Sequence, residues 1–441
     1  MNLETFEEPV LEFGGGGSHI DLRHGLMSYG PLDKGTDLAP TEVRLGVVGT
    51  KQTIEGVRAW LDRARNGISG KESRLRNLFP PFPGFSRDSC FGSSLVLNDR
   101  WCSEIRSREI AGLLALGGDA DLVDAAVELF LDAAKDVLDQ GGPAVLVCAP
   151  PSDLLAALDA DPSERRDVLD EELDEGSEPP PRTRAVSRVP FHDLLKARGM
   201  RLAVPIQMVR PETYFSGVSP LPKKRSQKGA RASRSLQDEA TRAWNLHTAL
   251  YYKAGGILWR IVRDPADLTA CFVGVSFYRS IDGDRLLTSV AQVFNERGEG
   301  MIVKGGPAKL DKDDRTPHLS EDDASTLLAQ AIQSYRREHR TNPARVVLHK
   351  TSRMNEAEIR GFAAGARAER IDSLDLLSVR RGFTRLFREG TYPPLRGRVV
   401  RVVEKRRASP SGVSTLRDLP RRTARHVFPA IHPAELDGSA S

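Results

Sequence analysis

The chain has 441 residues, of which 39% are hydrophobic and 28% are charged, and its formal net charge is +4 at pH 7. This length allows about two or three domains, the composition is typical of a soluble globular protein, and no apolar run is long enough to cross a membrane. The small net charge does not by itself indicate a polyanionic partner.

The cysteines predict neither a disulfide framework nor a zinc site, because none of them forms a CxxC pair. We expect reduced thiols in a cytoplasmic protein. The N-terminal stretch MNLETFEEPV has no basic segment followed by an apolar one, so no secretory signal is predicted. The four cysteines are Cys90, Cys102, Cys148 and Cys271.

The first part of the chain alternates strands with helices after an irregular start. Residues 1–40 have few periodic segments, and we expect a loop-like N-terminal linker that lies over a later domain. Alternation of strands and helices predicts a parallel sheet with helices on both sides. Strands are predicted at 43–50, 93–101 and 143–150, and helices at 53–65, with Thr53 as the N-cap, and at 119–140.

Two segments interrupt this pattern. Residues 159–182 are acidic and then proline-rich, which predicts a solvated insertion. A helix over 191–200 and a strand over 202–209 follow. Residues 216–235 carry lysines and arginines without any acid, and this composition fits either a disordered basic loop or a contact with a nucleic-acid backbone.

A helix, a glycine stop and a buried strand come next. Small, apolar and aromatic residues recur at helical spacing from Ala240 to Ala254, and Gly255-Gly256 ends the helix. The composition of Cys271–Phe277 is typical of a buried strand. Lys253 lies in the last turn of the helix, and Ser276 lies near the end of the strand.

The remaining elements predict a second α/β domain. The strand that contains Ser276 turns at an Asp-Gly pair and returns as two further strands. A helix with Ser320 as its N-cap follows, and then a strand at 344–350, a helix at 356–369 and a strand at 373–380. Three meandering strands followed by alternating helices and strands are typical of a ribonuclease-H-like domain.

Four polar residues could bind a terminal phosphate. His192 and Lys196 lie four residues apart on one predicted helix, Gln207 ends the next strand, and Lys253 ends a later helix. Together they offer two cations and further donors. A plainer interpretation is a solvated helix face and a lysine that stabilises a helix C-terminus, and the spacing alone does not decide between the two.

Several segments resemble prokaryotic Argonautes. FHDLLKA, VPIQMVRPETY and NLHTALYYKAGGILW resemble the MID domain and its junction with PIWI, whereas CFVGVSFYRS, VAQVFNERGEG, ARVVLHKTSR and YPPLRG resemble the PIWI domain. The resemblance covers about 43–397 and implies an α/β fold in which a Rossmann-like MID domain precedes a ribonuclease-H-like PIWI domain. The implied organisation is a linker at 1–40, MID at 41–215, a basic linker at 216–235 and PIWI at 236–441, which is the short type of Argonaute, with a C-terminal tail that departs from the family.

The resemblance also implies a role for the four polar residues. The MID pocket of Argonautes binds the 5′-phosphate of a guide strand, and its motif falls on His192, Lys196, Gln207 and Lys253. His192 stands where a tyrosine is common, so it keeps a donor but offers a smaller stacking surface. The same resemblance implies a magnesium ion at the 5′-phosphate.

The nuclease positions of the PIWI domain carry hydroxyls here. Ribonuclease-H-like nucleases hold two metal ions with carboxylates, and the matching positions are Ser276 and Thr351. A hydroxyl is a poor ligand for magnesium, so the sequence predicts an inactive nuclease with no catalytic residues. Asp282 and Asp284 are explained by the hairpin turn. Two alternatives remain: an active guide-directed endonuclease with an unorthodox set of acids, and a small-ligand α/β protein unrelated to nucleic acids.

Basic residues at strand ends could line a channel for a guide–target duplex through charge and shape, or could be scattered surface cations. The expected partners are a small guide RNA and a complementary target DNA. The resemblance to short Argonautes implies that a protein without nuclease activity acts through a separate effector protein, such as a sirtuin-like or TIR-type enzyme or a nuclease, in prokaryotic defence. The basic residues are Arg279, Lys304, Lys350, Arg353 and Arg385.

Overall fold

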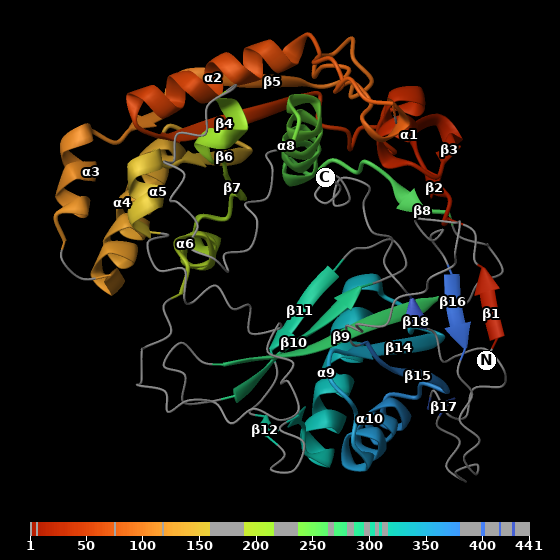
Figure 1. The fold of residues 1–441 in the computed structure, drawn as a ribbon. Coiled ribbons are helices and arrows are strands. Elements are labelled where there is room, and N and C mark those ends of the chain that lie inside the picture. Colours follow the sequence, from red (N-terminus) through yellow and green to blue (C-terminus); the bar gives the residue numbers. More distant parts are fainter. Residues whose placement is uncertain are drawn as a thin grey trace, which may run out of the picture. The chain divides into compact units, whose positions relative to one another are not determined.

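The computed structural model divides the chain into two compact units (Figure 1). The first unit comprises Val10–Arg182 and Ser187–Val262, and the second comprises Met1–Pro9, Thr183–Val186 and Arg263–Ser441. The structure describes residues 2–5, 8–74, 76–116, 119–158, 189–215, 237–262, 269–279, 286–294, 300–304, 308–310, 316–379, 398–401, 414–415 and 426–427. The predicted acidic insertion, the basic linker at 216–235 and Arg385 lie outside these residues.

The first unit is built on a parallel sheet of four strands in the order β5-β4-β6-β7. The chain passes from β4 to β5 on one side and then to β6 and β7 on the other, which is the doubly wound arrangement. Leu45 of β4 lies opposite Leu97 of β5 and Val145 of β6. The strands are β4 (Glu42–Gly49), β5 (Ser94–Glu104), β6 (Val145–Ala149) and β7 (Ile206–Met208).

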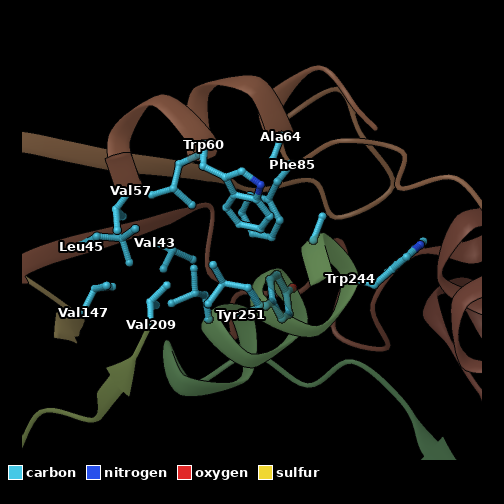
Figure 2. Close-up of a cluster of buried hydrophobic side chains, with 14 of the residues drawn as sticks. Val43, Leu45, Val57, Trp60, Ala64, Phe85, Val147, Val209, Trp244 and Tyr251 are labelled. Atoms are coloured by element: carbon cyan, nitrogen blue, oxygen red, sulfur yellow. The ribbon is translucent and has the colours of Figure 1, made fainter. Parts of the chain in front are cut away.

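Helices cover both faces of this sheet because its strands are buried on both sides. Alternate residues of β4 and β6 enter two different cores, so Val47 and Val147 face one core and Val48 faces the other. Figure 2 shows side chains of α2 and α8 beside those of the sheet in the first core. The helices are α2 (Lys51–Arg65), α3 (Ser107–Leu114), α4 (Asp119–Asp139), α5 (Ser152–Leu158), α6 (Phe191–Gly199), α7 (Pro211–Tyr214) and α8 (Glu239–Lys253).

Two local predictions for this unit need correction. Helix α2 begins at Lys51, before its predicted start, because Thr50 and not Thr53 is the N-cap, and the Thr50 hydroxyl accepts a hydrogen bond from the Thr53 amide at 3.3 Å. The predicted strand at 202–209 is shorter, since a 3₁₀ turn over Met200–Leu202 and Ala203 at φ 54° precede β7.

Residues 10–40 are more ordered than the sequence predicted. They contain helix α1 (Leu22–Tyr29), and β2 (Leu11–Glu12) pairs with both β3 (Ser18–His19) and β8 (Arg260–Ile261). Phe13 and Leu26 are fully buried in the core that α2 and α8 share. This burial explains why the segment packs within the first unit instead of forming a loose linker.

Helix α8 has the buried face that its periodicity predicts, from Ala240 to Tyr251. It ends in a Schellman motif, in which the Gly256 amide donates to the Tyr251 carbonyl at 3.1 Å and Gly255 adopts φ 95°. A side chain at position 256 would collide with the Tyr251 ring, because a Cβ atom there lies 2.2 Å from it. By packing, α8 belongs to the first unit, whereas the resemblance placed residue 236 at the start of PIWI.

The second unit contains a six-stranded mixed sheet in the order β11-β10-β9-β14-β15-β17. The first three strands pair antiparallel and the others pair parallel, which is the predicted ribonuclease-H-like arrangement. Helices α9 (Glu321–His339) and α10 (Glu356–Ala368) pack on one face (Figure 1). The strands are β9 (Ala270–Arg279), β10 (Leu286–Phe294), β11 (Gly300–Lys304), β14 (Arg345–Lys350), β15 (Ser373–Ser378) and β17 (Ser414–Thr415).

Short elements complete the described chain. Strand β16 pairs antiparallel with β1 and with β18, and β12 pairs antiparallel with β13. None of the helices in the described part of the chain combines the length and hydropathy that a membrane span requires. The short elements are β1 (Asn2–Thr5), β12 (Lys309–Leu310), β13 (Pro317–His318), β16 (Arg398–Arg401), β18 (His426–Val427) and the 3₁₀ turns Gly14–Gly16 and Arg76–Leu78.

Candidate functional site

Lys253, in the last turn of α8, forms hydrogen bonds with the edge strand β7. Its ammonium donates to the Ile206 carbonyl and to Gln207 Oε1, both at 2.7 Å. The Gln207 amide is oriented by its own second contact, in which Nε2 donates to the Met208 carbonyl at 2.9 Å. The structure therefore brings together two of the four predicted phosphate-binding residues, although they lie 46 positions apart in the chain.

A second cation acts on Lys253. Burial lowers the pKa of Lys253 to about 8, and the positive charge of Lys196 contributes to the same shift. Both hydrogen-bond acceptors of Lys253 are neutral oxygen atoms, and none of the described carboxylates pairs with it. The cluster of Lys196, Gln207 and Lys253, which we call the lysine cluster, thus concentrates positive charge without a described counter-ion.

His192 shares helix α6 with Lys196 and lies one turn before it. Its ring Nδ1 is 2.7 Å from the Asp193 carboxylate, and 41% of its side chain is exposed. The hydrogen bonds described for Lys253 go to Ile206 and Gln207, and the one described for His192 goes to Asp193. The geometry therefore places His192 on the face that carries Lys196 but does not bring it into the lysine cluster.

Ser276 and Thr351 lie beside each other at the ends of two parallel strands. Lys350 pairs with Val275 in the register of β14 and β9, and the Thr351 amide donates to the Val275 carbonyl at 3.3 Å. Val275 is turned toward α9 and α10, so its neighbour Ser276 faces the opposite side of the sheet. Thr351 is exposed and Ser276 is half-buried.

These two positions carry hydroxyls where a two-metal nuclease needs carboxylates. The described residues contain no group of three or more His, Cys, Asp or Glu side chains that could hold a metal ion. Asp282 and Asp284 lie outside the described residues, so the inactive nuclease stays a prediction.

The five basic positions have different outcomes. Arg279 and Lys304 end β9 and β11, and their side chains lie outside what the structure describes. Arg353 is exposed in the loop between β14 and α10. The prediction that Lys350 contacts a nucleic-acid backbone is wrong for this conformation, because its side chain is 0% exposed.

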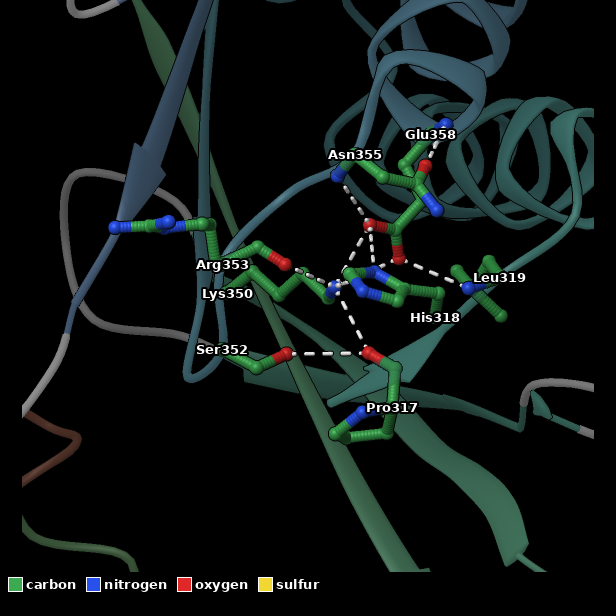
Figure 3. Close-up of polar contacts among 8 residues, drawn as sticks. All are labelled: Pro317, His318, Leu319, Lys350, Ser352, Arg353, Asn355 and Glu358. Atoms are coloured by element: carbon green, nitrogen blue, oxygen red, sulfur yellow. Dashed lines mark hydrogen bonds and ion pairs between the residues drawn. The ribbon is translucent and has the colours of Figure 1, made fainter. Parts of the chain in front are cut away.

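Lys350 instead belongs to a buried polar network that sequence reasoning missed (Figure 3). Its ammonium pairs with the Glu358 carboxylate at 2.7 Å and donates to the Pro317 and Arg353 carbonyls at 3.1 and 2.9 Å. Glu358 is also 0% exposed. Two signals were available: Lys350 alternates with the buried Val346 and Leu348, and the spacing of Asn355 and Glu358 is that of a capping box.

A cavity of about 790 Å³ opens at the carboxyl ends of the first unit's strands. Ligands of doubly wound sheets bind at this edge. None of the predicted site residues lines it. Its lining residues are Thr50, Lys51, Gln52, Thr53, Glu55, Ser107, Ile110, Pro151, Ser152, Asp153, Pro211 and Phe215.

The two sheets define a class of protein, in which a Rossmann-like α/β unit is joined to a ribonuclease-H-like unit. Solved Argonaute structures share this fold. The chain aligns with Clostridium butyricum Argonaute, which was solved with a guide DNA and a 19-mer target DNA, at 15% identity and a TM-score of 0.50. The alignment covers 90% of this chain and 43% of that one. The predicted resemblance to the MID and PIWI domains of Argonautes is thus confirmed for the fold.

Two further solved structures align over a similar part of the chain. Marinitoga piezophila Argonaute, solved with a 5′-hydroxyl guide RNA, has 8% identity and a TM-score of 0.49. The alignment covers 90% of this chain and 47% of that one. Drosophila Piwi has 15% identity and a TM-score of 0.44, with coverages of 90% and 43%. The chain spans less than half the length of each of these three Argonaute and Piwi structures. No protein-family model matches the sequence, and no curated protein matches it.

Proposed function

We propose that the protein binds a small guide strand by its 5′-phosphate and recognises a complementary strand by base pairing. The lysine cluster carries this proposal. Lys253 is held against the edge of the sheet by two neutral oxygens, close enough to Lys196 for the two positive charges to repel. A phosphate dianion would relieve this repulsion and accept charge-assisted hydrogen bonds from both ammonium groups.

The fold supports the same proposal. Among the solved structures that share it, Clostridium butyricum Argonaute was captured with both a guide and a target strand. The guide is proposed to be RNA and the target DNA, as the sequence resemblance implies. The protein would grip the backbone of the duplex, while base pairing supplies the specificity.

A magnesium ion fits poorly at the lysine cluster itself. The cluster offers two cations, and its side-chain oxygen, Gln207 Oε1, already accepts from Lys253. Magnesium prefers carboxylates, water and phosphate oxygens. The predicted cofactor therefore has no protein ligands in the described part of this site, and we assign it no role.

We further propose that the protein does not cut its target and instead signals to a separate effector. The hydroxyls of Ser276 and Thr351, side by side at the predicted nuclease centre, support this interpretation. A sirtuin-like or TIR-type enzyme or a nuclease would supply the output in prokaryotic defence. The alternative is an active guide-directed endonuclease with an unorthodox set of acids, and incubation of a guide-matched target with magnesium or manganese separates the two by the presence or absence of product strands.

Binding experiments test the guide pocket directly. Purified protein should retain short nucleic acids that carry a 5′-phosphate, and it should bind a 5′-phosphorylated oligonucleotide more tightly than the same strand with a 5′-hydroxyl. The Lys196→Ala, Lys253→Ala double variant should lose this preference. Lys135→Ala is a matched control, because Lys135 is an exposed lysine of helix α4 in the same unit and forms an ion pair with Asp132 at 2.7 Å. Equal affinity of the wild-type protein for both oligonucleotides would refute the pocket.

A further inference from the structure

The loop between β14 and α10 lies at the end of the sheet where Ser276 and Thr351 meet. It runs from Thr351 to Asn355, and both Thr351 and Arg353 are exposed. The Arg353 carbonyl turns inward to the Lys350 ammonium at 2.9 Å, while its side chain extends away from the buried network (Figure 3). The backbone of Arg353 is thus held by the buried network, whereas its guanidinium points away from that network.

The buried network joins this loop to two other segments. Glu358, on the first turn of α10, accepts from the Asn355 amide at 3.0 Å and from the Leu319 amide at 2.9 Å. His318 Nδ1 lies 2.9 Å from the same carboxylate. Lys350 and Glu358 therefore hold the loop, the start of α10 and the segment after β13 in one arrangement.

A buried ion pair is a costly way to stabilise a core. Both charges lose their hydration, and a well-packed apolar pair of similar volume is often as stable or more so. An apolar pair, however, could not hold the Arg353 and Pro317 carbonyls or the Asn355 and Leu319 amides, because it has no donors or acceptors. Compared with an apolar pair, the Lys350–Glu358 ion pair additionally fixes the orientation of these carbonyl and amide groups.

We propose that Lys350 and Glu358 are positioning residues, which hold the 351–355 loop so that Arg353 contacts a phosphate of the bound nucleic acid. The inference rests on the proposed function, since it requires a bound guide–target duplex. Lys350 and Glu358 act from inside the protein, whereas Arg353 lies at the surface. The buried ion pair is therefore needed for the phosphate contact but does not touch the phosphate itself.

Salt dependence distinguishes a lost phosphate contact from a general loss of structure. Each phosphate contact contributes about 1 to the slope of log affinity against log salt concentration. The Arg353→Ala variant should reduce the magnitude of that slope by about 1 for a 5′-phosphorylated guide RNA annealed to a target DNA. The Lys350→Met, Glu358→Gln double variant keeps a donor and an acceptor at position 358, and it should lower the slope by the same amount.

The combined variant tests whether the pair acts through Arg353. Adding Arg353→Ala to the double variant should lower the slope no further. Arg360→Ala is the control, because Arg360 is an exposed arginine of α10 paired with Glu321, and it should leave the slope unchanged. A folded double variant with the wild-type slope, or a combined variant that loses more than Arg353→Ala alone, would overturn the inference. Failure of the wild-type protein to bind the duplex would instead overturn the proposed function, and the inference with it.

A labelling experiment leaves the buried pair intact. The variants Arg353→Cys and Arg360→Cys are each treated with a maleimide, with and without the same guide–target duplex. Bound duplex should slow the labelling of position 353 and leave that of position 360 unchanged. Equal labelling rates at position 353 in the two conditions, with duplex shown to be bound, would overturn the inference even if the double variant does not fold.

Discussion

Lys253 and Gln207 are joined by a hydrogen bond of 2.7 Å, which ties the C-terminal turn of α8 to the edge strand β7. Gln207 is itself oriented by the Met208 carbonyl, so its oxygen faces the ammonium. Glycines at positions 255 and 256 end the helix directly after this lysine. The position of the Lys253 ammonium thus depends on where the glycines end the helix and on the hydrogen bond to Gln207.

The affinity for a 5′-phosphate should fall as the pH rises above about 8. The pKa of Lys253 is lowered to about 8 by burial and by Lys196, so the unliganded protein loses this proton in that range. A phosphate monoester is already dianionic there, because its second pKa is about 6. Binding then requires proton uptake, and the affinity should fall by up to about tenfold per pH unit.

Affinities measured from pH 7 to pH 10 for 5′-phosphoryl and 5′-hydroxyl oligonucleotides would test this dependence, with the difference between the two as the readout. Lys253→Arg keeps its charge over the whole range and should flatten the curve. An unchanged pH profile in that variant would argue against Lys253 as the titrating group.

Gln207→Glu should weaken binding of the phosphate while the protein stays folded. The new carboxylate would pair with the Lys253 ammonium and repel the phosphate, since like charges side by side cost several kcal/mol. We expect a loss of at least about tenfold in affinity at pH 7. Gln207→Met removes the acceptor without adding a charge and should have the smaller effect. Equal losses in the two variants, measured by titration with a phosphorylated oligonucleotide, would contradict the electrostatic account.

His247 should make the first unit sensitive to acid. Its ring is fully buried beside Trp60, Phe82 and Phe85, and Nδ1 donates to the Ala243 carbonyl at 2.8 Å. Burial lowers the pKa of His247 to about 4 from its ordinary value of 6.5. The unfolded chain therefore binds the proton first, and stability is full above about pH 6.5 and is lost as the pH falls toward 4.

At pH 5 this loss amounts to about 2 kcal/mol in the free energy of unfolding. His247→Phe removes the titrating group, so its stability should change less between pH 7 and pH 5 than that of the wild-type protein. Urea denaturation of both proteins at the two pH values measures the difference. Parallel losses in the two proteins would assign the acid sensitivity to other groups.

Two glycine substitutions should change stability in opposite directions. At Gly256 a methyl group would lie 2.2 Å from the Tyr251 ring, so Gly256→Ala should destabilise by about 1–3 kcal/mol. At Gly112, in the exposed middle of α3, an added Cβ meets nothing within 4 Å. Gly112→Ala should therefore stabilise by up to about 1 kcal/mol. Thermal denaturation compares them, and a stabilised Gly256→Ala would show that the turn after α8 is not tightly packed.

The sequence predicted the order and type of most elements, because the signals for them are local. The buried face of α8 follows from spacings of three and four residues, and the N-cap at Ser320 follows from one hydroxyl before an apolar period. The prediction failed where a local signal was ambiguous. Thr50 and Thr53 both suit an N-cap, and only the bond between them shows which one begins α2.

The candidate site could be predicted as a set of residues but not as an arrangement. Lys253 and Gln207 were singled out by their chemistry and by the resemblance to Argonautes, whereas their contact depends on how α8 packs on the sheet. His192 shows the limit of this reasoning, because its helix position was predicted but its neighbour Asp193 holds its ring.

The sequence by itself determined the alternation of strands and helices in both units, the two hydroxyls at the predicted nuclease positions, and the residue types of a phosphate site. Only the tertiary structure decided that residues 10–40 pack into a core, that Lys253 meets Gln207 and that Lys350 is buried. The physical reason is that burial depends on partners far along the chain. A lysine at a strand end faces solvent unless a carboxylate such as Glu358 reaches it, and that meeting is a property of the fold.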